Sequence, residues 1–490
     1  MTEEAPGNPG AVPVPPDGDI PVTWGTVRRM QAKLHRWAGE DPSRRFGDLF
    51  NVVCDPAFLA EAWYRVAGNA GARTAGIDGV TVARIESQIG VPEFLGQVRD
   101  SLRSGGFCPV QVRRVLIPKK SGKLRKLGIP TVTDRVVQAS LLLVLEPIFE
   151  ADFQPCSYGF RPNRRAQDAI TEIHKFATDG YEWVMEADIA ACFDEIGHAA
   201  LMARLRKRIK DKRVCALVKA FLKSGVMTET GDREETLTGT PQGGILSPLL
   251  ANIALTALDE HFMRQWNGWS KGQRHERRRT GQGTWRLIRY ADDFVIMVSG
   301  TRQHAGALRE EVTAVLAPLG LRLAPEKTRV VHISEGFDFL SFTIRRMRKR
   351  GTSRHYVYTV PSRKAIQAAK DTVKALTSRS TRNKDPGELI TSINRALQGW
   401  ANYFRHGVSY ATFATVDYHA WFRIARWLRR KYKRGRSRIG MPELRRRFCD
   451  KGWRFAWNGV VFKGAASVPV TRYRYRGYTI ATPWTTAATS

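Results

Sequence analysis

The feature that most constrains the fold of this 490-residue chain is a pair of apolar runs with a short acidic segment between them. The runs cover residues 285–290 and 294–298, and the segment that joins them is Ala291-Asp292-Asp293. This pattern predicts a strand, a tight acidic turn and a second strand. Because an Asp-Asp turn between strands is usually only a turn, a functional interpretation needs support from other parts of the sequence.

A second carboxylate site follows another strand-like segment. Residues 183–189 form that segment; Asp188 lies near its end, and Asp194 follows six positions later. A carboxylate at the end of a buried strand is unfavourable unless it meets a cation. Three carboxylates from adjacent strand ends would supply hard oxygen ligands for Mg²⁺. Two such ions about 4 Å apart can activate a 3′-hydroxyl and stabilise a leaving pyrophosphate.

Positive charge is concentrated towards the C-terminus. The whole sequence has 79 Lys and Arg against 46 Asp and Glu, a net charge of +33. Residues 345–490 hold 33 of these bases and 6 of the acids, which is +27 and leaves +6 for residues 1–344. Such asymmetry indicates a C-terminal region that binds a polyanion, and we expect nucleic acid. A solvated basic surface, as in a ribosome-associated protein or a lipid-headgroup binder, is the alternative.

The cysteine pattern and the hydropathy argue against several protein classes. The six cysteines are scattered without a Cys-x-x-Cys pair, which argues against a disulfide framework or a Cys-based zinc module. The longest apolar run, near residues 139–145, is far shorter than a membrane span, and no secretory signal opens the chain. We therefore expect a cytoplasmic protein with no membrane partner.

Hydrophobic periodicity divides the chain into a mixed α/β body of about 300 residues and a basic helical domain beyond residue 345. The proline-rich residues 1–22 predict a disordered tail. In the body we expect a hairpin with strands at 226–229 and 235–238, and a Gly- and Arg-rich loop at 267–284. The main predicted helices are 27–38, 56–68, 136–149, 166–177, 199–209, 247–262, 362–376, 386–405 and 413–433, and the other predicted strands are 112–118, 128–130 and a basic strand at 472–477.

A series of longer motifs surrounds the two acidic sites. A Gly-rich segment at residues 239–248 precedes the Asp-Asp turn, and its glycines permit close backbone approach. With these motifs the chain resembles the bacterial group II intron reverse transcriptases, which are multidomain maturases encoded by introns, from about residue 24 to residue 484. The motifs are TAGIDG, IPKKSGKLRKLGIPTV, SYGFRP, DIAACFD, GTPQGGILSPLLANI, YADD, PEKT, FDFLSF and GWANYFRHG.

The resemblance implies an α+β fold, a right-hand polymerase with fingers and palm that is followed by an all-α thumb or maturase domain. Because no HNH-type nuclease with paired cysteines follows, we expect a family member without that domain. The implied domains are a disordered tail at 1–22, an N-terminal extension and fingers at 23–180, a palm with fingers-type elements at 181–345, a helical thumb and maturase domain at 360–440, and a basic C-terminal extension at 441–490.

The resemblance also implies an active site. Asp188 and Asp292 match the principal ligands of two Mg²⁺ ions, Asp293 matches the third carboxylate, and the Ile189 carbonyl would complete the shell. Lys327 matches a lysine that can protonate the leaving pyrophosphate; pairing with Glu326 or a phosphate is the alternative. Lys119 and Arg125 match residues that bind the incoming triphosphate, and Arg113 and Arg114 would assist them; contact with template phosphates is the alternative for these two arginines. Phe193 matches a steric gate below the sugar, and packing in the core is its alternative. Gln242 with Gly243 completes the implied substrate-binding residues.

Two positions depart from the family pattern where glycine is usual. Ala190-Ala191 follows Asp-Ile in place of Lys-Gly, and Ser341 occupies the glycine position of the FLGF segment. Neither departure removes a carboxylate of the site.

The last long predicted helix interleaves aromatic and basic side chains. We expect its aromatics to pack in a three-helix core and its basic residues to bind RNA phosphates. The predicted RNA-binding residues are Arg423, Arg426, Arg429, Arg430, Lys431 and Lys433.

The implied partners are group II intron RNA, an RNA template with a DNA primer, deoxynucleoside triphosphates and target DNA. The implied location is the bacterial cytoplasm, on intron RNA or nucleoid DNA. A host-recruited reverse transcriptase in defence or repair, and an RNA-binding maturase with weak polymerase activity, are the alternatives.

Overall fold

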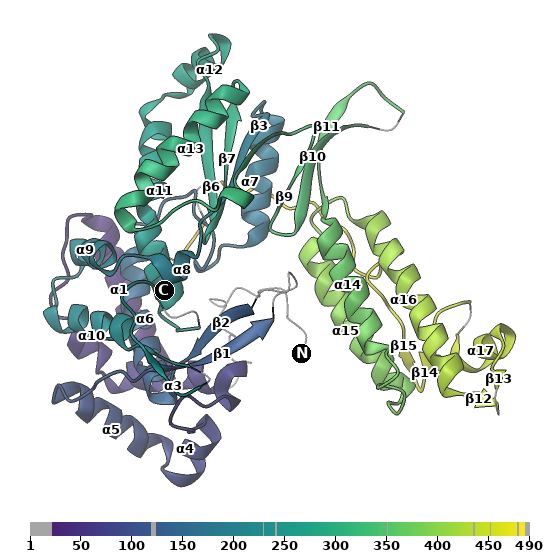
Figure 1. The fold of residues 1–490 in the computed structure, drawn as a ribbon, viewed down its shortest axis with the longest axis horizontal. Helices are drawn as coiled ribbons and strands as arrows, with labels where there is room; N and C mark the ends of the chain where they lie inside the picture. Colours follow the sequence, from purple (N-terminus) through teal and green to yellow (C-terminus); the bar gives the residue numbers. More distant parts are fainter. Residues whose placement is uncertain are drawn as a thin grey trace. The chain divides into compact units, whose positions relative to one another are not determined.

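The computed structural model of the chain describes residues 22–118, 124–228, 230–240, 243–349, 351–434, 437–450, 452–477 and 480–485. These residues fall into two compact units (Figure 1), and helices and strands occur in both, as an α+β fold requires. The predicted disordered tail lies outside the described residues except for Val22. Of the described residues, the larger unit comprises those within 22–165, 185–330 and 477–485, and the smaller unit comprises those within 166–184 and 331–476.

Helix α6 (Val132–Glu150) lies at the centre of the helical part of the larger unit, and its apolar side chains are almost wholly buried. Helices α1 (Val22–Glu40) and α3 (Pro56–Ala67) pack against it. Helix α3 begins where the Asp55 carboxylate accepts a hydrogen bond from the Ala57 N–H, with a proline in the first turn. The same part of the chain contains α2 (Phe50–Val53), η1 (Ala70–Arg73), α4 (Val82–Gln88) and α5 (Val91–Arg103).

A first four-stranded sheet has the order β2-β1-β4-β5. Strands β1 (Val112–Pro118) and β2 (Leu124–Ile129) form an antiparallel pair, and residues 119–123 between them lie outside the described residues. Strand β4 (Val226–Met227) pairs in parallel with β1 and antiparallel with β5 (Arg233–Glu234). The predicted hairpin around Gly231 is confirmed, but its second strand begins two residues earlier than predicted.

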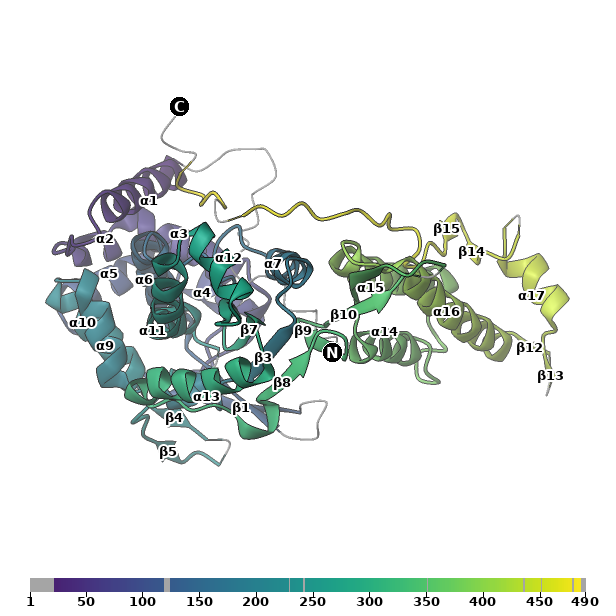
Figure 2. The ribbon, with the colours of Figure 1, turned by 90° about the horizontal axis from the view of Figure 1, so that it is seen from above.

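A second four-stranded sheet, in the order β6-β7-β3-β8, carries the acidic turn. Its strands are β3 (Trp183–Asp188), β6 (Thr284–Tyr290), β7 (Asp293–Ser299) and β8 (Arg329–His332). Tyr290 pairs with Asp293 at the tip of the β6–β7 hairpin, so the predicted strand, acidic turn and strand are confirmed. Figures 1 and 2 show α11 (Ser247–Gly268) and α13 (Arg302–Leu316) alongside these strands. Other elements are α8 (Cys192–Glu195), α9 (His198–Arg208), α10 (Lys212–Lys223), η2 (Ala317–Leu319) and η3 (Pro325–Lys327).

The predicted loop at 267–284 is wrong, because it contains helix α12 (Lys271–Arg279). Ser270 and Gln273 form a reciprocal capping box at its start. Arginines of the helix lie over tryptophan rings, with Arg274 4.4 Å from the Trp266 ring centre and Arg277 4.5 Å from that of Trp269. The segment has no apolar stripe, so its hydrophobic pattern did not predict a helix. Capping and cation–π contacts stabilise the helix instead.

The smaller unit combines helix α7 (Ala166–Thr178), a three-stranded sheet and a helical bundle. Strands β10 (Phe342–Arg348) and β11 (His355–Pro361) extend past residue 345, where a purely helical pattern was predicted. The three predicted helices are confirmed as α14 (Arg363–Leu376), α15 (Pro386–Phe404) and α16 (Tyr410–Lys431). The remaining elements are β9 (Phe337–Phe339), β12 (Lys433–Arg434), β13 (Ser437–Arg438), α17 (Met441–Phe448), β14 (Ala456–Trp457) and β15 (Val460–Val461).

The segment at 472–477 forms no strand, contrary to the prediction. Its alternating basic and aromatic residues are held by side-chain contacts in place of a backbone ladder. In the smaller unit, the buried carboxylate of Asp168 accepts hydrogen bonds from the Tyr473 hydroxyl at 2.9 Å and from the Arg476 guanidinium at 2.5 Å. In the larger unit, Trp484 packs against His35 of α1 and donates a hydrogen bond to Gln31.

Across the described parts of the chain, we find no helix with both the length and the apolar character that crossing a bilayer requires.

Asp417 of α16 anchors the chain that follows β15. Its carboxylate accepts hydrogen bonds from the N–H groups of Ala465 at 2.6 Å and Ala466 at 2.8 Å. Substituting Asp417→Ala leaves both donors without this acceptor, and we expect the free energy of unfolding to fall by about 2 kcal/mol. Denaturant unfolding measures the change. Asp371→Ala, which removes an exposed carboxylate from α14, is the control and should shift the midpoint little; equal shifts in both variants would contradict the assignment.

Candidate active site

The three predicted carboxylates lie on neighbouring strands of the second sheet. Asp188 is the last residue of β3, Asp292 lies in the turn between β6 and β7, and Asp293 is the first residue of β7, which is the neighbour of β3. Ala291, which precedes the pair, has a φ of +58°, a conformation that is strained for a residue with a Cβ. The sheet order therefore brings together carboxylates that are about one hundred residues apart in the sequence.

Desolvation and charge repulsion both act on this cluster. Desolvation raises the pKa of Asp292, and the charge of Asp188 raises it further. Desolvation, the charge of Asp292 and a hydrogen bond with Asp188 raise the pKa of Asp293 to about 8. Because the Asp293 side chain still reaches solvent, we give more weight to the neighbouring carboxylates than to desolvation. The cluster therefore holds more negative charge than its protein surroundings compensate.

Lys327 supplies a positive charge at the edge of the cluster. It ends η3, and its Nζ donates a hydrogen bond of 2.5 Å to Oδ2 of Asp188. This hydrogen bond raises the pKa of Lys327, so the amine keeps its proton. The predicted alternative, a pair with Glu326, is not the contact that the structure shows for this ammonium group.

Among the described residues, no three Asp, Glu, His or Cys side chains are arranged around a common point that could hold a metal ion. Lys327 engages Asp188, and a hydrogen bond joins Asp188 to Asp293, so these oxygens face each other and the ammonium group. Ile189 is buried and forms a β-bridge with Leu323, which fixes the backbone next to Asp188. The chemistry of the donor set suits a divalent cation, because such an ion would relieve the repulsion between the carboxylates.

The Gly-rich motif packs backbone against backbone next to the carboxylates. Gly239 has a φ of +82°, and a Cβ there would lie 2.6 Å from the carbonyl oxygen of Phe193. Gly243 has a φ of +110°, and a Cβ there would lie 2.5 Å from the carbonyl oxygen of Gly128 in β2. The glycines thus join α8 to the first sheet, and any other residue would separate them. Gln242 lies outside the described residues.

Phe193 is half-buried in α8, and its ring meets the ring of Phe160 edge to face at 6.4 Å. Phe160 belongs to the SYGFRP motif and has a φ of +55°. The structure therefore places this motif beside Phe193. Since part of the Phe193 ring is accessible, its packing role leaves a face available to a ligand.

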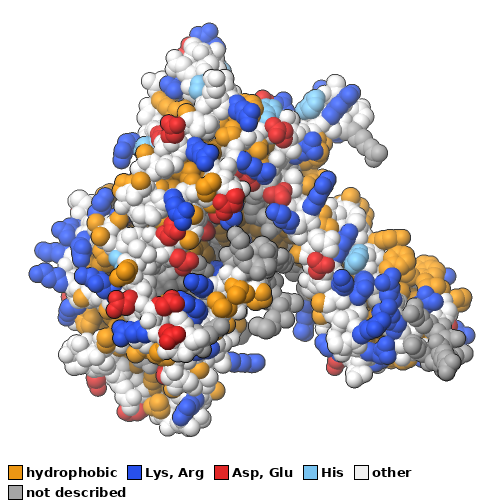
Figure 3. All heavy atoms as spheres, in the orientation of Figure 1, with side chains coloured by type: hydrophobic (Ala, Val, Ile, Leu, Met, Phe, Trp, Pro, Cys, Tyr) orange, Lys and Arg blue, Asp and Glu red, His pale blue; other side chains and the backbone are white. Residues whose placement is uncertain are grey.

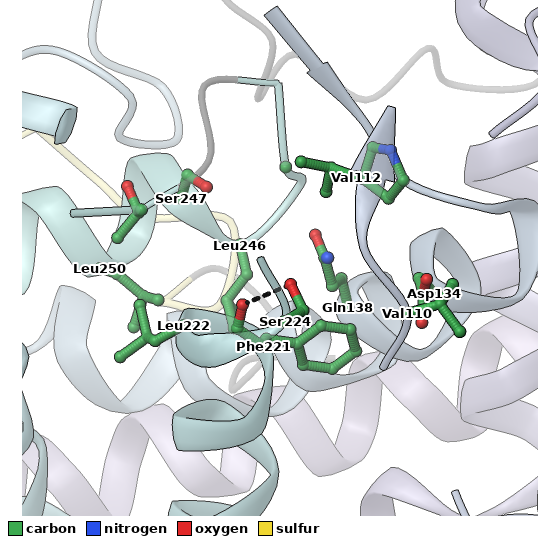
Figure 4. A pocket seen from close by; sticks show the side chains of 13 residues that line it. Val110, Val112, Asp134, Gln138, Phe221, Leu222, Ser224, Leu246, Ser247 and Leu250 are labelled. Atoms are coloured by element: carbon green, nitrogen blue, oxygen red, sulfur yellow. Dashed lines mark hydrogen bonds between the residues drawn. The ribbon is translucent and has the colours of Figure 1, made fainter. Parts of the chain in front are cut away.

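A pocket beneath the Gly-rich motif lies between β1, α6, α10 and α11 (Figure 4). Gln138 of α6 lines it and accepts a hydrogen bond from the N–H of Ile245, which anchors the end of the motif. Asp134, also in the lining, is buried, and desolvation raises its pKa to about 6. Its carboxylate accepts a hydrogen bond from the Thr131 hydroxyl, and the Asp134 N–H donates one back to that hydroxyl, so Asp134 has a structural role at the start of α6.

The residues that were predicted to bind the triphosphate have different surroundings in the structure. Arg125 is exposed on β2, and its charge acts on Asp292, which places it on the side of the carboxylates. Arg113 donates to the carbonyl oxygen of Ala75 at 2.8 Å, and Arg114 forms a bidentate pair with Glu234. The latter two arginines therefore support the fold in this structure. Lys119 lies outside the described residues.

Sequence reasoning missed a buried network behind the acidic turn. Arg289 of β6 is fully buried, and its Nε donates a hydrogen bond of 2.7 Å to Oδ1 of Asp259 in α11. Its Nη1 donates to Oδ1 of Asn252 at 3.0 Å and to the carbonyl oxygen of Ala291 at 2.8 Å. Nη2 also donates to the Ser157 hydroxyl at 2.8 Å. Arg289 therefore holds the strained residue before Asp292 in place.

Residues of the same network also form hydrogen bonds with the SYGFRP motif. The Tyr158 N–H donates to the carbonyl oxygen of Arg289, and Asn252 donates to the carbonyl oxygen of Gly159 at 2.9 Å. A Cβ at Gly159 would lie 2.4 Å from the N atom of Ala291. The glycine of the motif thus permits contact with the turn. The signal for this network in the sequence was an arginine inside an apolar strand, a position that requires a buried acidic partner.

Residues of α16 that were predicted to bind RNA have different environments. Arg426 is exposed, whereas Arg423 donates to Thr377 Oγ1 and to the carbonyl oxygen of Lys374, which caps the end of α14. Arg429 donates to the carbonyl oxygen of Ile439, and Lys431 to that of Arg382. Arg430 is half-buried, and the side chain of Lys433 lies outside the described part. RNA binding by these residues remains a prediction.

Comparison with known proteins decides the family. Residues 117–344 match the model for "Reverse transcriptase (RNA-dependent DNA polymerase)", and residues 366–447 match "Group II intron, maturase-specific domain". The chain is 38% identical to Protein YkfC of Escherichia coli K12 over 359 residues, which cover 69% of this chain and 93% of that protein. The chain belongs to the group II intron reverse transcriptase/maturase family.

Other members of this family align over a smaller part of their length. The Group II intron-encoded protein LtrA of Lactococcus lactis is 33% identical over 367 residues, which are 65% of this chain and 60% of LtrA. Nuclear intron maturase 1 of Arabidopsis thaliana is 27% identical over 305 residues, which are 46% of this chain and 42% of that protein. The predicted family is therefore confirmed.

The two positions that depart from the glycines of the family pattern both have a left-handed backbone conformation in this structure. Ala191 has a φ of +42° and Ser341 a φ of +67°, the conformation that glycine adopts most easily.

The buried pair of Arg289 and Asp259 predicts a large loss of stability when its charge balance is broken. Asp259→Asn keeps the side-chain shape but leaves the Arg289 charge uncompensated, and we expect the free energy of unfolding to fall by about 3 kcal/mol or more. Glu260→Gln on the same helix is the matched control, because Glu260 pairs with Arg204 near the surface. That change should cost about 0–1 kcal/mol. Denaturant unfolding of both variants checks the prediction, and equal losses would contradict it.

Proposed function

We propose that this protein is an RNA-directed DNA polymerase that copies group II intron RNA and binds the same RNA to promote splicing and mobility. The observation that carries the proposal is the convergence of Asp188, Asp292 and Asp293 at one edge of a sheet. Membership of the family supports both parts of the proposal. In this interpretation the larger unit contains most of the fingers and palm, and helices α14, α15 and α16 of the smaller unit form the thumb and maturase domain.

The carboxylates and the Ile189 carbonyl would hold two Mg²⁺ ions. Bound Mg²⁺ would stabilise the negative charge of the attacking 3′-hydroxyl and of the leaving pyrophosphate. Lys327 keeps its proton next to Asp188 and is placed to donate it to the leaving group. Only one of the three ammonium hydrogens is needed for the hydrogen bond to Asp188, and opening of that bond would make the Asp188 oxygen available as a ligand.

Substrate binding would involve residues around this cluster. Arg125 lies on the side of the carboxylates and suits the triphosphate of a deoxynucleotide, with Lys119 as the second predicted contact. The accessible part of Phe193 suits contact with the sugar, where a ring excludes a 2′-hydroxyl. Gln242 with Gly243 is the further predicted contact with the nucleotide or template. The RNA template, its DNA primer and the target DNA are proposed partners on the same grounds.

The smaller unit would bind intron RNA through its basic surface. Figure 3 shows Lys and Arg side chains gathered on the face of this unit that carries α14 and α16. Residues 345–490 hold 33 bases and 6 acids, so the surface strongly attracts a polyanion. We propose a cytoplasmic location on intron RNA or nucleoid DNA.

Two different observations argue against the two alternative functions, a maturase with weak polymerase activity and a host-recruited reverse transcriptase. A maturase with weak polymerase activity has no need of three carboxylates on neighbouring strand ends, and their presence favours an active polymerase. A host-recruited reverse transcriptase would keep the same carboxylates. The maturase-specific match at residues 366–447 favours an intron-encoded protein over a host-recruited one.

Removal of one carboxylate tests the polymerase site. We expect Asp292→Ala to abolish Mg²⁺-dependent primer extension on an RNA template, because a ligand of the ions is lost, while intron RNA binding stays within twofold, on the order of experimental scatter. Primer-extension and filter-binding assays measure the two properties. Glu276→Gln, at an exposed pair on α12, is the control and should extend primers normally. Undiminished extension by Asp292→Ala would refute the site.

Charge removal tests RNA binding by α16. Arg426 is exposed, so Arg426→Gln should lower the affinity for intron RNA and reduce the slope of log affinity against log salt by about one. Thermal stability should be unchanged. By contrast, Arg423→Gln removes hydrogen bonds to the end of α14 and should lower the melting temperature. A salt slope that is the same in Arg426→Gln and the parent protein would show that this arginine contacts no phosphate.

A further inference from the structure

The smaller unit exposes a cluster of aromatic rings, so the prediction that the aromatic side chains of α16 all pack in a helical core is wrong for part of them. Tyr418 is 68% exposed and Phe422 46% exposed on α16, and Trp453 after α17 is 49% exposed. The rings are in contact, because the Tyr418 and Phe422 centres lie 4.7 Å apart and Phe422 lies 5.0 Å from Trp421. Trp421 in turn lies 5.7 Å from Trp453. We call these four residues the aromatic surface; exposed apolar clusters of this kind mark binding sites.

The aromatic surface is rigidly held from below. Trp421 stacks on the fully buried Phe455 with ring centres 5.3 Å apart, and its Nε1 donates a hydrogen bond of 2.7 Å to the carbonyl oxygen of Trp453. Tyr418 and Phe422 are four positions apart on a helix and therefore share a face. A ligand that stacks on these rings would meet a preformed surface and lose little conformational entropy.

Positive charge borders the aromatic surface. The Arg445 guanidinium lies 4.9 Å from the centre of the Trp453 ring, and Arg426 is exposed one helical turn beyond Phe422. Two nearby acids are paired with arginines, Asp450 with Arg454 and Glu443 with Arg447. Figure 3 shows hydrophobic side chains next to Lys and Arg on this part of the smaller unit. Aromatic rings between positive charges suit a ligand with flat apolar faces and a negative backbone.

We propose that the aromatic surface stacks unpaired bases of RNA. Unpaired bases offer their faces to aromatic side chains, whereas the bases of a duplex already stack on one another. The phosphates of the same strand would contact Arg426 and Arg445. The inference rests on the proposed RNA binding and adds its ligand chemistry, a single-stranded segment. A protein partner with an apolar face would lack the negative backbone that the surrounding charges attract.

The test compares single-stranded and duplex RNA on the full chain. The variant is Tyr418→Ala with Phe422→Ala, and the probes are a single-stranded RNA oligonucleotide that contains 2-aminopurine and a duplex of the same length. Each stacked base accounts for about five- to 150-fold in affinity. We expect the variant to bind the single strand at least about fivefold more weakly and to lose the quenching of 2-aminopurine. Duplex affinity and the salt slope should stay unchanged, because no charge is removed.

Two further variants provide controls. Tyr410→Ala removes a ring that is 72% exposed at the start of the same helix but is not part of the aromatic surface, and it should bind both probes normally. Tyr418→Phe keeps a ring and should bind the single strand like the parent protein. Unchanged single-strand binding in the double variant, or an equal loss on both probes, would overturn the stacking surface alone. A parent protein that binds neither probe would overturn the proposed RNA binding as well.

Discussion

The buried ion pair between Arg289 and Asp259 is the interaction on which the geometry of the candidate active site depends. Moving two charges into the interior is unfavourable unless both are fully hydrogen-bonded, and here the guanidinium has partners in α11, in the acidic turn and in the SYGFRP motif. The pair therefore locks three chain segments into one arrangement. Its contact with the carbonyl oxygen of Ala291 stabilises a backbone conformation that the turn alone would not favour.

Negative charge is concentrated at the candidate active site and positive charge towards the C-terminus, as a polymerase that binds RNA would require. In the larger unit, desolvation and the charges of neighbouring carboxylates raise the pKa of Asp293 to about 8, and Lys327 offsets part of that charge. The C-terminal residues do the opposite and accumulate arginines. Several of those arginines, such as Arg423 and Arg476, contribute to folding by capping a helix or binding a buried carboxylate. A high density of arginine in this family member thus stabilises its own structure as well as attracting a polyanion.

Much of the fold was predictable because it follows from local pattern. The β6–β7 hairpin has an apolar run on each side of its turn, and the helices α6, α15 and α16 have apolar residues at helical spacing, so these predictions were confirmed. The predictions failed where local pattern misled. Helix α12 lacks an apolar stripe, and the alternating residues 472–477 look like a strand but find their partners through Asp168.

The sequence by itself determined the identity of the chemical groups: Asp188, the Asp292-Asp293 turn, the Gly-rich motif and the basic C-terminal surplus. It also placed each group at the end of a strand, in a loop or on a helix, because those assignments depend on neighbours along the chain. Only the tertiary structure decided which groups meet. The contacts of Lys327 with Asp188, of Arg289 with Asp259 and of Trp421 with Phe455 join residues 139, 30 and 34 positions apart. Such contacts arise from sheet order and helix packing, which no local pattern encodes.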